Sequence, residues 1–264
     1  MLNLKVEDAA EEVLRALRSK GPPVDVIQLA RDEGILLAPS TGYGPEFHGR
    51  LEYRASRQKF LLFYPTQVDG TLTRRQRFNF SHELGHYYLE PHRDALLQGS
   101  VHNSTPGFVC QESFEREADD FAAALMIPRR FMESKLARRD FLELKGVLAM
   151  ADECQTSGQC AAIRYATFTG ECCCVFLTRN GKIIYNIVSD EARSCGFSYV
   201  ERLPETSASE QALADPRIIK GHAWRASDWF GEKRSDPKVF EEAVGLGYGD
   251  YVLTLLSLEI DREE

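Results

Sequence analysis

The sequence predicts an α+β fold, with a mainly helical first half that carries a small sheet and a mixed second half. Apolar residues recur at helical spacing over residues 4–18, 24–33, 73–89 and 112–126, with strand-like runs between residues 35 and 64. From about residue 171 the pattern changes to short strand-like runs separated by turn signals. A chain of 264 residues, 43% hydrophobic and 27% charged, has enough core for one large domain or two to three small ones.

Charge and composition narrow the class of protein. The net charge is −8 and the pI about 5.4, which gives no global electrostatic case for nucleic-acid binding. No apolar run reaches the roughly 18 residues that a membrane span needs. Residues 1–8 are acidic and amphipathic, unlike a signal peptide. We therefore expect a cytoplasmic protein with no membrane partner.

The chain has seven cysteines, three of them consecutive at Cys172, Cys173 and Cys174. Neighbouring cysteines on a strand point to opposite faces, so they cannot bond each other without strain. We expect free thiols that act as small buried hydrophobic groups. A redox-sensing role for this run or for Cys195 is the alternative.

The elements of the first half follow from apolar spacing and from Gly and Pro positions. They are predicted as helices over residues 4–18 and 24–33, strands over 35–38, 49–53 and 59–64, a helix over 73–89 ended by Pro91, a loop over 92–111 and a helix over 112–126. The hairpin at 49–64 precedes the third helix, and its edge can hold an extended peptide by main-chain hydrogen bonds. Equally, the hairpin can serve only to cover the core.

The third helix contains Ser81-His82-Glu83-Leu84-Gly85-His86, a His-Glu-x-x-His pattern. Residues four apart lie on one face of a helix, so His82 and His86 can bind one metal ion together. Glu83 points roughly 100° away, which lets it act as a general base without coordinating the ion. Zinc would lower the pKa of a bound water to about 7 and polarise a carbonyl. The pattern therefore predicts a zinc-type hydrolase, although manganese also suits such ligands.

A catalytic zinc site needs a third protein ligand. His92 has metzincin-like spacing but lacks the Gly that turns the chain there, and His102 has no supporting pattern. Glu115 is favoured because Asp119, one turn later, is placed to accept a hydrogen bond from a ligating histidine. The small residues Ala118 and Ala122 would also let the two helices pack closely, and Glu117 is the runner-up.

Residues 140–166 are a helix-turn-helix candidate. A DNA-reading helix usually presents several basic or amide side chains. Residues 136–165 contain four basic and four acidic groups, so there is no basic stripe. Direct DNA binding and a packing or substrate-docking role both remain open.

The last part of the chain is predicted to form a second small core. Residues 172–178 and 182–188 flank Asn180-Gly181, the strongest short hairpin signal. A segment at 218–224, a helix near residues 238–244 and a segment at 251–260 complete the predicted α+β domain.

Two motifs together carry a family resemblance. Arg77-Phe-Asn-Phe-Ser-His-Glu-Leu-Gly-His86, followed by Glu115-Arg-Glu-Ala-Asp-Asp-Phe-Ala-Ala-Ala-Leu-Met-Ile-Pro128, resembles the ImmA/IrrE family of metallopeptidases. The first Glu of the family's second pattern matches Glu115, and its Asn/Asp matches Asp119. Many members have a His where this chain has Glu90, so no role is carried over to that position.

The resemblance implies a three-part layout and a function. A zincin-like metallopeptidase domain would occupy residues 1–135, a helix-turn-helix-like segment 136–168, and a GAF-like sensor domain 169–264, as in a radiation-response regulator of the family. The implied substrate is an XRE-type helix-turn-helix repressor, whose cleavage would induce a DNA-damage or stress response. The alternative is a DNA-binding or ligand-sensing transcriptional regulator with a structural metal site. The group that stabilises the oxyanion is left open among Tyr87, Tyr88, His92 and Arg50.

Overall fold

The computed structural model describes residues 3–44, 46–99, 113–137, 143–214, 217–232, 235–247 and 249–259. The chain forms two compact units, one from Met1–Phe131 with Glu153–Ser157 and one from Met132–Asp152 with Gly158–Glu264. Each unit contains both helices and strands, so the predicted α+β class is confirmed. Within the described residues, none of the helices combines the length and apolar character that crossing a bilayer requires.

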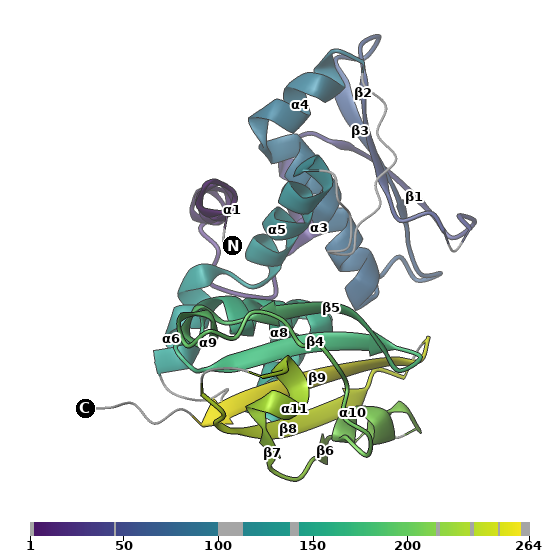
Figure 1. Cartoon of the computed structure of the whole chain (residues 1–264). Helices are drawn as coiled ribbons and strands as arrows, with labels where there is room; N and C mark the ends of the chain where they lie inside the picture. The colour runs from purple at the N-terminus through teal and green to yellow at the C-terminus, as the bar shows by residue number, and fades with distance from the viewer. Residues whose placement is uncertain are drawn as a thin grey trace. The chain divides into compact units, whose positions relative to one another are not determined.

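The first unit is mainly helical and carries a three-stranded sheet (Figure 1). Its elements are α1 (Leu4–Ala16), α2 (Val26–Asp32), β1 (Leu36–Ser40), β2 (Arg50–Arg54), β3 (Lys59–Pro65), α3 (Arg74–Tyr88), α4 (Glu90–Leu97) and α5 (Ser113–Met126). Helix α6 (Arg129–Ala137) contains the boundary between the two units. The predicted helices and the predicted hairpin of this half are confirmed.

Strand β3 is the centre of the small sheet. It runs parallel to β1, with Leu36 opposite Leu61, and antiparallel to β2, with Arg50 opposite Phe63. Among the strands that the structure describes, β2 pairs with β3 alone and is therefore an edge strand. Within the described residues, its second edge has no strand paired to it, which is the arrangement to which an extended peptide can add.

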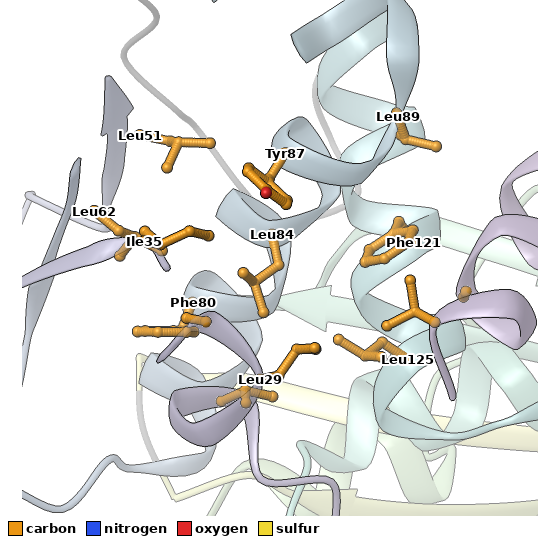
Figure 2. Close-up of a cluster of buried hydrophobic side chains, with 14 of the residues drawn as sticks. Leu29, Ile35, Leu51, Leu62, Phe80, Leu84, Tyr87, Leu89, Phe121 and Leu125 are labelled. Carbon is orange, nitrogen blue, oxygen red and sulfur yellow. The ribbon is translucent and has the colours of Figure 1, made fainter. Parts of the chain in front are cut away.

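The core of the first unit lies between this sheet, α3 and α5 (Figure 2). The sheet supplies Leu51 and Leu62, while α3 contributes Phe80 and Leu84 from the turns that also carry the His-Glu-x-x-His motif. Leu84 lies between His82 and His86 in the sequence and is fully buried in this core. Packing of Leu84 therefore fixes the rotation of α3 about its axis, and with it the direction in which the two histidines point.

Local signals fix where α3 begins. The Thr73 hydroxyl accepts a hydrogen bond from the Gln76 backbone N–H at 3.2 Å, and the Gln76 side chain accepts one from the Thr73 N–H at 2.8 Å. This capping box satisfies two backbone donors that the first turn would otherwise leave exposed.

The end of α3 differs from the prediction. The helix ends at Tyr88, Leu89 is extended, and Pro91 lies in the first turn of α4. The loop predicted over 92–111 is thus wrong for residues 92–97, and residues 100–112 lie outside the described part. Proline is well tolerated in the first turn, where its missing N–H has no helical partner, so it starts the next helix here.

The second unit is built on an antiparallel sheet (Figure 1). Its helices and strands are α7 (Leu144–Glu153), α8 (Gly158–Phe168), β4 (Cys173–Arg179), β5 (Lys182–Val188), α9 (Asp190–Ser194), α10 (Ala208–Gln211), β6 (Ile219–Lys220), β7 (Trp224–Arg225), α11 (Ala226–Phe230), β8 (Lys238–Gly245) and β9 (Tyr251–Glu259). The strand order is β5-β4-β9-β8-β6, and β7 pairs with β8. The hairpin predicted around Asn180-Gly181 is confirmed, with both residues at positive φ.

Both faces of β4 are covered. Cys174 and Phe176 pack in the core that contains Trp229 of α11, while α8 packs against the sheet. The six cysteines of the described part are free, as expected, and Cys173 and Cys174 are fully buried. The Sγ atoms of Cys172 and Cys195 lie 4.0 Å apart, and the redox-sensing alternative stays a prediction.

The helix predicted near residues 238–244 is wrong, because this segment is strand β8. Its Glu-Glu-Ala run favours a helix locally. In the fold, however, the buried Glu241 carboxylate accepts hydrogen bonds from the backbone N–H groups of Ala208 and Ser209, at 2.8 and 2.7 Å. Tertiary partners for a buried carboxylate therefore outweigh local helix propensity.

Candidate metal centre

The two histidines of the motif converge, one turn apart on α3. The Nε2 atoms of His82 and His86 lie 3.1 Å from each other, and their ring centroids are 4.8 Å apart at 78°. His82 is fully buried and His86 is 3% exposed. Both rings therefore present one nitrogen to the same enclosed point.

Glu115 of α5 completes the cluster. Its Oε2 lies 3.5 Å from His82 Nε2 and its Oε1 lies 3.3 Å from His86 Nε2. Bonds of about 2.0–2.2 Å arranged tetrahedrally around zinc place ligand atoms about 3.3–3.6 Å from one another. His82, His86 and Glu115 are accordingly a group that could hold such an ion. The runner-up Glu117 lies outside this cluster.

Close approach of α3 and α5 makes the cluster possible. A Cβ atom at Gly85 would lie 3.1 Å from the Ala118 Cα and 3.2 Å from its carbonyl oxygen. The glycine between the two histidines therefore lets the backbone of α5 come close enough for Glu115 to reach them.

Asp119 forms a hydrogen bond with Nδ1 of His82, the ring nitrogen that does not face Glu115. Its Oδ1 lies 2.8 Å from His82 Nδ1, so the carboxylate accepts the Nδ1 proton and leaves Nε2 facing Glu115 and His86. Burial by itself lowers the pKa of His82, but hydrogen bonds to Asp119 and Glu115 outweigh it and raise that pKa to about 10. The centre without a metal ion thus holds a proton that a cation must displace.

Glu83 lies on a different side of α3 and is 1% exposed. It faces the start of β2, where a Cβ atom at Gly49 would lie 2.8 Å from its Oε1. Sequence reasoning missed this contact, which joins residues far apart in the chain. Next to Gly49, His48 has its pKa lowered by burial and by the charge of Arg75, with a smaller contribution from His82.

The other candidates occupy different places. His92 Nδ1 contacts the Nδ1 of His86, on the side of that ring away from Glu115, and His102 lies outside the described residues.

Of the groups considered for stabilising the oxyanion, Tyr87 donates a hydrogen bond to Glu33 at 3.0 Å and Arg50 forms an ion pair with Glu52 at 2.7 Å. Burial, followed by the charge of Glu33, raises the pKa of Tyr88.

Comparison with known proteins agrees with the motifs. Residues 72–164 match the IrrE N-terminal-like domain, Peptidase_M78. That stretch belongs to the Peptidase_M78 family. It spans α3, α5 and α7 and ends within α8, so the family match includes His82, His86 and Glu115.

Comparison of folds extends beyond this stretch. A solved structure, a Mycobacterium tuberculosis transcriptional regulator, aligns with 96% of this chain and 76% of its own, at a TM-score of 0.66 and 16% identity. This similarity shows a shared fold over both units. No curated protein matches the chain in sequence.

Proposed function

We propose that this protein is a metal-dependent, site-specific endopeptidase. The observation that carries the proposal is the triangle of His82 Nε2, His86 Nε2 and the Glu115 carboxylate, with sides of 3.1–3.5 Å. It lies in a Peptidase_M78 stretch, with Glu83 next to the first histidine. Zinc is the proposed ion and manganese the alternative.

The proposed roles follow from the chemistry of each residue. His82, His86 and Glu115 would hold the ion, which when bound would supply Lewis-acid chemistry, acidifying water and polarising the scissile carbonyl. Glu83 would take a proton from the attacking water and give it to the leaving amine. Asp119 would hold His82 in the ligating tautomer.

Strand β2 is the proposed binding site for an extended substrate. It is an edge strand, and its N-terminal neighbour Gly49 packs against Glu83. A peptide that paired with the available edge of β2 by main-chain hydrogen bonds would therefore pass close to the proposed base. The hairpin at residues 49–64 thus becomes the proposed substrate holder.

The proposed substrate is an XRE-type helix-turn-helix repressor, whose cleavage would induce a DNA-damage or stress response. Support comes from the family resemblance and from the fold shared with a protein described as a transcriptional regulator. A protease that inactivates a repressor would change transcription without contacting DNA itself.

The second candidate is a transcriptional regulator that binds DNA or senses a ligand and uses the metal site structurally. The description of the structural neighbour favours it. Burial of α8 weighs against its DNA-binding form, because residues 160–166 are all buried and α8 packs on the sheet. A recognition helix needs exposed side chains that reach base edges. A GAF-like sensing role for residues 169–264 stays part of this candidate.

A cleavage assay tests the proposal. The purified protein, with zinc or manganese added, is incubated with a purified XRE-type repressor from the same organism, beside the Glu83→Gln variant. We expect one discrete cut by the wild type and none by the variant, whose metal content should be unchanged. No cut under either metal, with the metal shown to be bound, would favour the second candidate.

A further inference from the structure

The nitrogen of His86 that faces away from Glu115 has its own chain of partners. His86 Nδ1 lies 3.0 Å from His92 Nδ1, and His92 Nε2 lies 3.0 Å from Oε2 of Glu117. The His92 side chain is 1% exposed and that of Glu117 is 36% exposed. A continuous path of hydrogen bonds therefore runs from the candidate centre to a partly exposed carboxylate.

Packing holds His92 in this path. Its ring stacks on Phe114 of α5, with centroids 4.1 Å apart and planes at 13°. His92 stands in the first turns of α4, where the extended Leu89 and Pro91 turn the chain back from α3. The position of the His92 ring is thus set by its place in α4 and by stacking on α5, in addition to its two hydrogen bonds.

The chemistry of the three groups sets the direction of the bonds. A carboxylate only accepts, so the proton of a neutral His92 lies on Nε2 and points at Glu117. His92 Nδ1 then has a lone pair and accepts the Nδ1 proton of His86. His86 in turn keeps a lone pair on Nε2, and this nitrogen lies 3.1 Å from His82 Nε2.

We infer that His92 is a positioning residue that, with Glu117, holds His86 in the tautomer whose Nε2 lone pair faces His82 and Glu115. It would serve His86 as Asp119 serves His82, through an imidazole interposed before the carboxylate. This role rests on the proposed metal centre, because the lone pair is useful only for binding a cation.

Two substitutions separate this role from simple packing. His92→Phe keeps a flat ring to stack on Phe114 but removes both nitrogens. His92→Asn loses the ring but places an amide oxygen near the position of Nδ1, where it can accept from His86. A packing role predicts that Asn is the more harmful change, while the positioning role predicts that Phe is.

The measurement is the zinc dissociation constant of the full-length protein, determined by competition with a chromophoric chelator. We expect His92→Phe to weaken zinc binding about 10- to 100-fold, as loss of an outer partner commonly does, and His92→Asn to keep most of the affinity. Asp119→Ala provides the benchmark for the other histidine. Wild-type affinity in His92→Phe, or a loss in His92→Asn as large as in His92→Phe, would overturn the inference.

A second measurement needs no variant and remains valid if His92→Phe fails to fold. The ¹⁵N shifts of the His86 ring in the metal-free wild type report which nitrogen carries the proton. We expect Nδ1 to be protonated, and a proton on Nε2 alone would overturn the inference. Neither measurement requires peptidase activity, so they stay informative if the cleavage assay fails.

Discussion

Gly85 of α3 lies directly against the backbone of Ala118 of α5, and this contact sets the distance between the proposed ligands. A Cβ atom at Gly85 would meet the Ala118 Cα, its carbonyl oxygen and the Phe121 Cβ at 3.1, 3.2 and 3.3 Å. All of these atoms belong to a packed helix, so relief requires the two helices to separate. Glu115, one turn before Ala118, would move away from His82 and His86 with α5.

Gly85→Ala should therefore weaken zinc binding more than it weakens the fold. Alanine favours a helix over glycine by about 1 kcal/mol, which offsets part of the packing cost. We expect roughly tenfold weaker zinc binding, comparable to the loss of an outer partner, with a small change in thermal unfolding of the metal-free protein. Gly170→Ala is the control, because a Cβ atom there would meet nothing within 4 Å. Unchanged affinity in Gly85→Ala would show that the helix spacing is not limiting.

Gly49→Ala should damage catalysis and spare metal binding. The new Cβ atom would lie 2.8 Å from Glu83 Oε1, and the carboxylate, as the far end of a flexible side chain, would move. Because displacement of a catalytic group by about 1 Å can cost about 100-fold in rate, we expect kcat to fall roughly 10- to 100-fold. Steady-state cleavage and chelator competition measure the two effects separately.

Gly44→Ala is the matched control for that change, since it lies in the same segment and its Cβ atom would meet nothing within 4 Å. A Gly49→Ala protein that cleaves at the wild-type rate would argue against Glu83 as the base.

Asp119→Ala should weaken zinc binding about 10- to 100-fold, because His82 loses the acceptor of its Nδ1 proton at 2.8 Å. Asp94→Ala, an exposed carboxylate on α4, is the control and should bind zinc normally. The comparison is made by chelator competition at one pH. Equal affinity of the two variants would contradict the proposed role of Asp119.

Zinc binding should release a proton at neutral pH. Burial opposes protonation of His82, but Asp119 and Glu115 raise its pKa to about 10 from an ordinary value of 6.5. Metal-free protein therefore holds this proton below about pH 10, and zinc must displace it. We expect roughly one proton per zinc from His82, and an apparent affinity that rises with pH until about pH 10.

The same shift has a consequence for the stability of the metal-free protein. The folded-state pKa is the higher one, so the stabilisation is fully present below pH 6.5 and is lost as the pH rises through about 10. Calorimetry in buffers of different ionisation enthalpy measures the proton release, and thermal unfolding across this pH range measures the stability. A pH-independent zinc affinity between pH 7 and 9 would contradict the protonated centre.

Local periodicity was enough to predict the arrangement on each helix. The four-residue spacing of His82 and His86 places them on one face, and the same spacing relates Glu115 to Asp119. The small side chains beside them indicated close packing of the two helices. The spacing of these residues depends on one helix at a time, and the close packing depends only on the two helix faces that meet.

Contacts between residues of different elements could not be predicted from this spacing, because they depend on how the chain turns between those elements. The path from His86 through His92 to Glu117 exists because α4 begins immediately after α3, where Pro91 suggested a loop. The contact of Gly49 with Glu83 joins the residue before β2 to a helix residue 34 positions later, and no spacing rule relates them. Pairing with β9 likewise makes strand β8 of a segment whose local pattern favours a helix.

Burial of His82, His86 and Glu115 also governs how fast the centre exchanges its ion. An ion held there would have to leave three ligands that are at most 3% exposed, so release would depend on opening of the packed α3 and α5 helices. Exchange should then be slow compared with changes in the supply of free metal.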